Sequence, residues 1–451
     1  MSEEQKRGKG SMILGSPVKP LILFTIPMVV GNLFQQFYNI IDSIVVGNEV
    51  GEGALAAVGA STSITMLFVM IATGTGIGCS VVISQLFGAG KLARMTTAIS
   101  TALISILGFS VILSIIGMII NQGLLGLMGT PDDIFTEAVT YLQIYFYGFV
   151  FLFLYNAFSA IFNALGDSVK PLLFLIFSSL LNIGLDIYFV ASLRMGVAGV
   201  AWATLIAQGI SAVLSFVFLM IKLKGIKTEK YVFFDIHMLK NMVTVAIPTI
   251  IQQSIVSVGM LLIQAAVNRF GSTFLAGYTA AIKIDGIAIV PMVAVGNAMS
   301  TYVAQNMGAG KPERIGKGYR ICLAMAAGIG LVIAVIFCFC GEQFVGLFLD
   351  SEKGAEAIAV GASYLSTVSL FYFVMGIMNV SNGVLRGAAD MRWFLFSSLA
   401  NLCTRVALTY ALADVTGGMI IMWANPAGWL VGFLIAAFRY FQGGWKKKQL
   451  V

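Results

Sequence analysis

The stretch SQLFGAGKLAR at residues 84–94 returns as AQNMGAGKPER at residues 304–314, so both carry the pattern Q-x-x-G-A-G-K-x-x-R 220 residues apart. Two further pairs have nearly the same spacing. Ile26-Pro27 is matched by Ile247-Pro248, and F-S-S-L-x-N at 177–182 is matched at 396–401. The chain is therefore two copies of one unit of about 220 residues.

Composition places both copies in a membrane. Of 451 residues, 59% are apolar and 10% are charged, whereas a soluble domain is about one quarter charged. A helix needs about 20 apolar residues to cross a bilayer. Twelve such runs occur, six in each copy: 18–46, 54–87, 96–120, 137–163, 170–191, 196–221, 241–268, 275–306, 317–341, 357–385, 393–413 and 417–440. We expect an all-α membrane protein with twelve transmembrane helices in two pseudo-symmetric six-helix lobes, a design typical of transporters.

The charge distribution predicts the topology. With the N-terminus placed inside, 22 of the 27 Lys and Arg residues fall in cytoplasmic segments, as the positive-inside rule requires. The net charge of +7 then reflects topology, and we expect no nucleic-acid partner. The prediction is a multi-pass protein of the cell (plasma) membrane with both termini cytoplasmic. Its parts are a cytoplasmic tail at 1–17, a six-helix lobe at 18–221, a cytoplasmic linker at 222–240, a second lobe at 241–441 and a basic tail at 442–451.

The G-A-G-K motifs resemble a phosphate-binding loop only superficially. A P-loop needs Ser or Thr after the lysine, between a strand and a helix. Here Leu92 follows Lys91 and Pro312 follows Lys311. We therefore interpret the glycines as helix ends and the cations as anchors on the cytoplasmic side.

Five charged residues fall well inside the expected spans: Asp42, Asp186, Lys283, Asp285 and Arg405. A charge at the bilayer centre costs about 2.5–3.5 kcal/mol on insertion scales, so each is a candidate for function. The alternative role is a charge pair that joins two helices.

Four oxygen-bearing residues reach similar depths in the outer half of the first lobe. Asp42 lies about four residues, roughly 6 Å, from the outer end of its run. Asn182 and Asp186 are four apart on one helix face, and Thr204 lies on the next run. Two carboxylates, an amide oxygen and a hydroxyl suit a small cation such as Na⁺. Crowded or buried carboxylates also favour proton binding, so both coupling ions stay open.

The second copy does not repeat this site. The repeat offsets place Arg405 opposite Asp186 and Ile263 opposite Asp42. Lys283 and Asp285 are two residues apart on one helix and cannot pair well. We therefore expect Asp285 to pair with Arg405 in a second-lobe polar cluster.

These features resemble the multidrug and toxic compound extrusion (MATE) family over residues 17–441. The resemblance rests on the twelve spans in two lobes, on IPMVVGNLFQQFYNIIDSIVVG at 26–47 and on the repeated Q-x-x-G-A-G-K. Asn182, Asp186 and Thr204 fit the cation site of its DinF-like bacterial branch. The resemblance implies export of organic, often cationic compounds in antiport with H⁺ or Na⁺, by alternating access of two lobes, without a cofactor.

A substrate pathway is expected from polar, aromatic and Met side chains, because these suit flat amphiphilic cations. The candidates are Gln35, Gln36, Tyr38, Tyr145, Phe149, Met375 and Asn379; ordinary helix packing is the alternative role for each. The expected partners are small organic molecules and membrane lipids, around a monomer.

The sequence leaves two other functions open. A lipid-linked glycan flippase of the same superfamily would need a strongly cationic cavity, and this chain offers few cations beyond Lys283 and Arg405. A membrane-embedded enzyme is disfavoured because no metalloprotease motif or nucleophile–base set occurs in the sequence.

Overall fold

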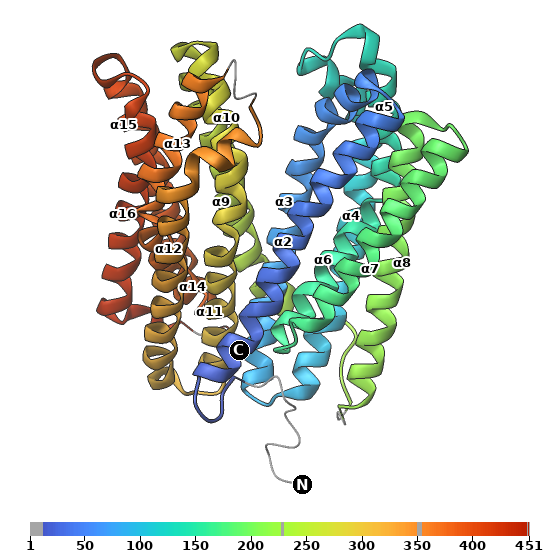
Figure 1. Ribbon diagram of the computed structural model, residues 1–451. Coiled ribbons are helices and arrows are strands. Elements are labelled where there is room, and N and C mark those ends of the chain that lie inside the picture. The colour runs from blue at the N-terminus through green and yellow to red at the C-terminus, as the bar shows by residue number, and fades with distance from the viewer. Residues whose placement is uncertain (1–11, 227–229, 350–353, 449, 451) are drawn as a thin grey trace. The chain divides into compact units, whose positions relative to one another are not determined.

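The fold is helical throughout the part of the chain described by the computed structural model, residues 12–226, 230–349, 354–448 and 450 (Figure 1). Parts of four predicted segments lie outside those residues: 1–11 of the N-terminal tail, 227–229 of the linker, 350–353 of the second lobe, and 449 and 451 of the basic tail.

The helices follow the apolar runs. The first copy forms α2 (Val18–Glu49), α3 (Glu52–Gly88), α4 (Leu92–Leu127), α5 (Asp132–Tyr147), α6 (Phe149–Ala164), α7 (Val169–Asp186), the π-helix η1 (Ile187–Ser192) and α8 (Gly196–Lys224). The second forms α9 (Ile236–Val267), η2 (Asn268–Phe270), α10 (Ser272–Ala288), α11 (Val290–Gly308), η3 (Pro312–Arg314), α12 (Ile315–Gly346), α13 (Ala355–Ser369), α14 (Tyr372–Gly387), α15 (Met391–Thr416), α16 (Met419–Gln442) and η4 (Gly444–Lys447).

Length and hydropathy allow these helices to cross a membrane. Among the described residues, ten helices are long and apolar enough, or up to twelve if each of two bent pairs is one span. The pairs are α5–α6, bent by 51°, and α13–α14, bent by 50°. The prediction of an all-α membrane protein is confirmed, and its twelve expected spans match the upper count.

The repeated motif ends a helix in the same way in both copies. Gly90 and Gly310 have φ values of +70° and +65°, a conformation that glycine adopts without a Cβ clash. The following amide of Lys91 donates to Leu86 O at 3.1 Å, and that of Lys311 donates to Asn306 O at 2.9 Å. This bonding is the Schellman cap, and it confirms that the glycines terminate α3 and α11.

The chain divides into two compact units, and the divisions lie inside helices. The first unit includes residues 26–250; the second includes 12–25 and 251–451. The sequence instead predicts lobe boundaries in loops, at 222–240 and before residue 18. The difference arises because the first part of α9 packs on the first unit: a Cβ at Gly78 of α3 would lie 2.8 Å from the backbone nitrogen of Ala246. The functional division into two lobes stays a prediction.

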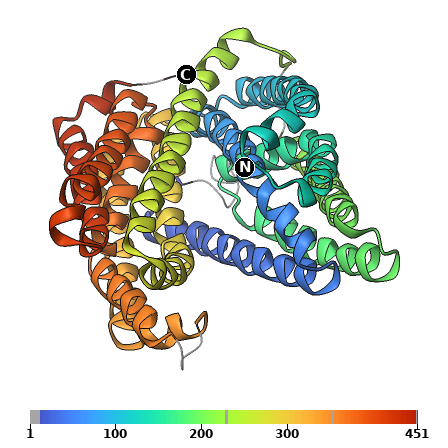
Figure 2. The ribbon, with the colours of Figure 1, turned by 90° about the horizontal axis from the view of Figure 1, so that it is seen from above.

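Small residues let helices approach closely within the second unit. α11 packs extensively on α14, and α15 packs on α16; α15 and α16 lie side by side in Figures 1 and 2. A Cβ at Gly296 of α11 would lie 2.8 Å from the carbonyl oxygen of Asn379 in α14. Lipid gives no hydrophobic driving force between membrane helices, so close van der Waals contacts of this kind stabilise their packing.

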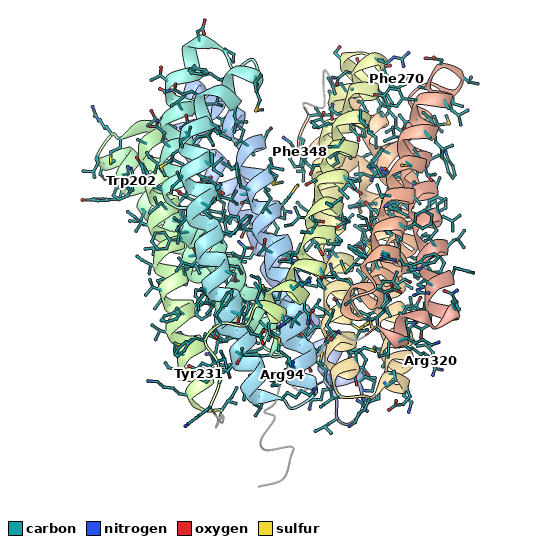
Figure 3. All side chains as sticks on the ribbon, turned by 180° about the vertical axis from the view of Figure 1, so that it is seen from behind. Arg94, Trp202, Tyr231, Phe270, Arg320 and Phe348 are labelled. Carbon is teal, nitrogen blue, oxygen red and sulfur yellow. The ribbon has the colours of Figure 1, made fainter. Side chains whose placement is uncertain are left out.

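The labelled side chains in Figure 3 show that each unit has two distinct ends. In the first unit, Arg94 and Tyr231 lie at one end, and Trp202 lies nearer the other. In the second unit, Arg320 and Phe270 lie at opposite ends.

Candidate functional site

Two carboxyl groups meet inside the first unit. Asp42 lies on α2, and Asp186 is the last residue of α7. Their side chains are within hydrogen-bonding reach of each other, and Asp186 is fully buried. Asp42 Oδ1 and both Asp186 oxygens are buried without a hydrogen-bond partner. Because carboxylates only accept hydrogen bonds, this contact is favourable only with a proton or a cation between the two groups.

A hydrogen-bonded chain lies one helical turn away from the acids. Tyr38 on α2 donates its phenol proton to Asn182 Oδ1 on α7. Asn182 Nδ2 donates to Thr204 Oγ1 on α8 at 3.5 Å, and that hydroxyl donates to Val200 O at 3.1 Å. Tyr38 precedes Asp42 by four residues, as Asn182 precedes Asp186, so both pairs share a helix face.

The structure therefore brings together all four residues predicted as a cation site, and it adds Tyr38. The sequence predicts Tyr38 to lie on the substrate pathway, and that role stays a prediction. Its phenol fixes the amide of Asn182, which is 98% buried. The signal for this role was present in the sequence as the spacing of four residues from Asp42.

An irregular helix follows the acid pair. The π-helix η1 begins at Ile187, directly after Asp186. π-turns insert an extra residue into a helix and occur often at functional sites. Here the widened turn packs against α8, where a Cβ at Gly199 would lie 3.2 Å from Phe189 Cβ. Asp186 is therefore held where the regular helix ends.

Removal of the Tyr38 hydroxyl should destabilise the packing of α2 on α7. In Tyr38→Phe, Asn182 Oδ1 loses its donor, and an unsatisfied buried acceptor costs about 1–3 kcal/mol. The hydroxyl donates to Asn182, so we expect this cost as a lower free energy of unfolding. The measurement is the melting temperature of the purified variant. Tyr147→Phe, which removes a hydroxyl from an exposed side chain on α5, is the matched control, and equal effects in both variants would contradict the assignment.

The other predicted pathway residues of the first unit make local contacts. Gln35 Nε2 donates to Asn39 Oδ1 at 3.1 Å, and Gln36 is half-buried. Tyr145 packs edge-on against Phe149, with ring centroids 5.5 Å apart. Phe149 is fully buried and packs in the core, and its place on the substrate pathway stays a prediction.

The two pathway residues predicted in the second unit also serve packing. Met375 is 7% exposed, and its carbonyl oxygen accepts a hydrogen bond from Asn379 Nδ2 at 3.2 Å. Both lie on α14, at its close contact with Gly296 of α11.

The second-unit polar cluster differs from the prediction. The expected ion pair between Asp285 and Arg405 is not among those of the described residues. Instead, Tyr372, the first residue of α14, donates its phenol proton to Asp285 Oδ1. Arg405 Nε is buried without a partner. Lys283 lies 5.9 Å above the ring of Phe348, so it does not pair with Asp285, as expected from their spacing.

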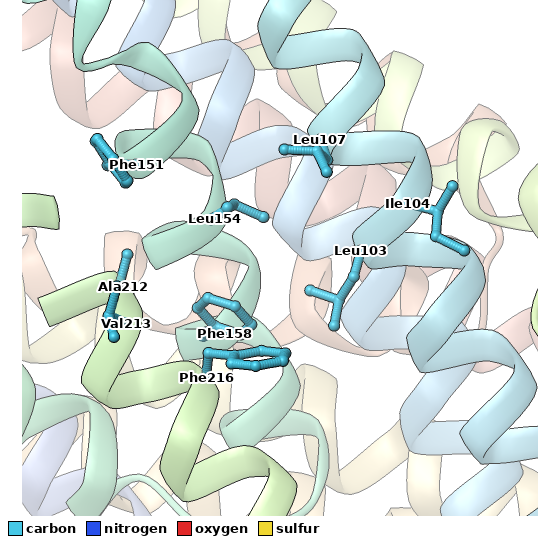
Figure 4. A pocket seen from close by; sticks show the side chains of 9 residues that line it. All are labelled: Leu103, Ile104, Leu107, Phe151, Leu154, Phe158, Ala212, Val213 and Phe216. Atoms are coloured by element: carbon cyan, nitrogen blue, oxygen red, sulfur yellow. The ribbon is translucent and has the colours of Figure 1, made fainter. Parts of the chain in front are cut away.

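An apolar pocket of about 280 Å³ lies among α4, α6 and α8 in the first unit (Figure 4). It is lined by Leu103, Ile104, Leu107, Phe151, Leu154, Phe158, Ala212, Val213 and Phe216. None of these residues carries charge, so a cation would find no counter-charge there. None belongs to the predicted site.

Membrane-spanning helices from a duplicated unit, with buried carboxylates between them, define a multi-pass membrane transporter. The chain matches the MatE family over residues 27–188 and 248–411. It therefore belongs to the multidrug and toxic compound extrusion (MATE) family, whose members are transporters and not enzymes.

Curated relatives and solved structures cover nearly all of the chain. It is 32% identical over 446 residues to the probable multidrug resistance protein YpnP of Bacillus subtilis (strain 168), covering 97% of each chain. It is 27% identical to the probable multidrug resistance protein YoeA of the same strain, covering 99% of this chain and 97% of YoeA. A solved outward-facing multidrug resistance MATE family transporter of the MOP superfamily matches with a TM-score of 0.90 and 24% identity, over 98% of this chain and 99% of that one. This likeness shows the shared fold.

Proposed function

We propose that this transporter exports organic compounds in antiport with protons, which bind at the Asp42–Asp186 pair. The observation that carries the proposal is the contact between the two carboxyl groups, whose oxygens have almost no other partners. A shared proton supplies the missing donor and removes one of two adjacent negative charges.

The neighbouring oxygen atoms favour a proton over Na⁺. Asn182 Oδ1 already accepts the phenol proton of Tyr38. The Thr204 hydroxyl directs its proton to Val200 O while it accepts from Asn182. A bound Na⁺ would have to compete with these bonds for its oxygen ligands, whereas a proton between the acids leaves them intact.

Proton binding would drive the transport cycle through α2. Loss of one charge lets α2 pack more closely on α7, which it already approaches at Gly31, where a Cβ would lie 3.5 Å from Leu172 Cδ1. Pro27 lies within α2, and its ring removes a backbone hydrogen bond and weakens the helix there. The ion shifts the equilibrium only if the two conformations bind it unequally.

The substrates we propose are amphiphilic organic compounds, many of them cationic. The names of the two Bacillus relatives, both probable multidrug resistance proteins, support this class. The presence of Asp42, Asn182, Asp186 and Thr204 together supports assignment to the DinF-like branch. We further propose a monomer in the plasma membrane with cytoplasmic termini, supported by the one-sided distribution of Lys and Arg.

Purified protein in liposomes tests the coupling ion. An acidic lumen should drive uptake of a fluorescent organic cation as protons leave, because antiport exchanges the two across the membrane. An outward Na⁺ gradient at equal pH should drive none. The control is liposomes without protein at the same gradients. Uptake driven by Na⁺ alone would assign the site to Na⁺, and uptake independent of both gradients would refute antiport.

A further inference from the structure

The second copy of the repeated motif holds the chain's own N-terminal segment. The backbone amide of Met12 donates to Gln305 Oε1 at 3.0 Å. Asn306 Nδ2 lies 3.5 Å from Met12 O and donates to it. All three residues belong to the second unit, so these contacts lie within one compact unit.

The two cations of the same motif continue the contact. Lys311 Nζ donates to Ile13 O at 3.5 Å, and Arg314 Nη2 donates to Gly15 O at 2.8 Å. Arg314 Nε also donates to Asn306 Oδ1 at 3.1 Å, which fixes the guanidinium. The motif therefore binds backbone groups of residues 12, 13 and 15.

The segment is buried as well as bonded. Met12 and Ile13 are each 1% exposed, and Gln305 and Asn306 are fully buried. Apolar side chains that are this well covered add hydrophobic stabilisation to the hydrogen bonds. This part of the expected N-terminal tail, residues 12–17, is thus an integral part of the second unit.

The first copy of the motif is used differently. Lys91 and Arg94 are exposed, and in the described part of the chain neither side chain has a hydrogen bond or ion pair. The segment that precedes the second repeat contacts α4 instead, one turn after Arg94. The amides of Val232 and Asp235 donate to the hydroxyls of Thr97 and Thr101, at 3.2 and 3.0 Å. If the Lys and Arg residues of the motif served only as membrane anchors, we would expect both copies of the motif to have the same surroundings.

We propose that the second motif is a backbone-binding site whose ligand is residues 12–15 of this chain, and that it clamps the start of α2 to the second unit. α2 begins at Val18 and passes into the first unit between Thr25 and Ile26. Asp42 lies further along the same helix. The clamp therefore fixes one end of the helix that carries the ion-binding acid, and this role in the cycle rests on the proposed transport function.

A reporter thiol tests the clamp without transport. Ile13→Cys places a thiol in the buried segment, and labelling by a membrane-impermeant maleimide is measured on full-length protein with no substrate or ion gradient; the parent without the reporter gives the background. In Lys311→Ala/Arg314→Ala, the labelling rate should rise about tenfold or more, since a charged hydrogen bond contributes at least that factor.

Lys91→Ala/Arg94→Ala is the matched control, because it removes the same two charges from the equivalent motif. Its labelling should stay within about twofold of the reporter parent, the range expected of surface substitutions. Size-exclusion elution and thermal stability show that each variant is folded. A folded Lys311→Ala/Arg314→Ala protein whose reporter stays protected would overturn the proposal, as would an equal rise in the control. Both results are independent of whether protons drive transport.

Discussion

Replacement of Asp42 by asparagine is expected to abolish proton-driven efflux while leaving the protein folded. The amide has nearly the volume of the carboxyl group, but it cannot take up and release a proton at neutral pH. The pair with Asp186 then loses its ability to change charge, and with it the coupling. We expect transport of a fluorescent cation into acid-loaded liposomes to fall by about two orders of magnitude or more, as is usual when an essential proton carrier is lost.

Asp285→Asn is the matched control for this experiment. Asp285 is also a carboxylate within a span, but it accepts a hydrogen bond from Tyr372 in the second unit. It should retain proton-driven transport. Near-normal transport by Asp42→Asn, or loss of transport only in Asp285→Asn, would move the coupling site to the second unit.

Substitution of Gly383 by valine should produce a large loss of stability. Gly383 lies on α14, where a Cβ would collide with the carbonyl oxygen of Gly296 on α11. Both partners are backbone at a buried helix crossing, so neither can move aside. We expect a loss of about 3 kcal/mol, the upper part of the usual range for overpacking, seen as a lower melting temperature and aggregation on size exclusion.

Gly108→Val controls for the change of residue type. Gly108 is in the middle of α4, and a Cβ there meets nothing within 4 Å. Its melting temperature should stay close to that of the parent. Equal losses in both variants would show that helix propensity, and not the contact between α11 and α14, determines the effect.

The fold could be predicted because apolar runs and internal repeats are local properties of the sequence. Each run is long enough to be recognised alone, and the repeated Q-x-x-G-A-G-K marks equivalent helix ends. The depth of a residue in the membrane also follows from the local sequence, because it depends on the distance from the end of its run. Asp42 could therefore be grouped with Asn182, Asp186 and Thr204 before their contacts were known.

The contacts that were missed depend on tertiary structure. Tyr38 and Asn182 are 144 residues apart, and a tyrosine in a span is more often a packing residue than a ligand. The choice of Tyr372 over Arg405 as the partner of Asp285 depends on which side chain reaches the carboxylate. The unit boundaries lie inside α2 and α9 because of helix packing, which cannot be inferred from the apolar runs of the sequence.

This division also bears on the origin of the duplicated chain. Each compact unit is completed by a helix start that belongs, in sequence order, to the other repeat: residues 12–25 complete the second unit, and residues 236–250 complete the first. A protein made of one repeat would leave its own helix start without a place to pack, and it would need a second copy to supply the missing piece. An ancestor of this kind would be an obligate, segment-swapped homodimer. Fusion of two such copies would make that exchange internal to one chain and leave the two copies of the motif free to diverge.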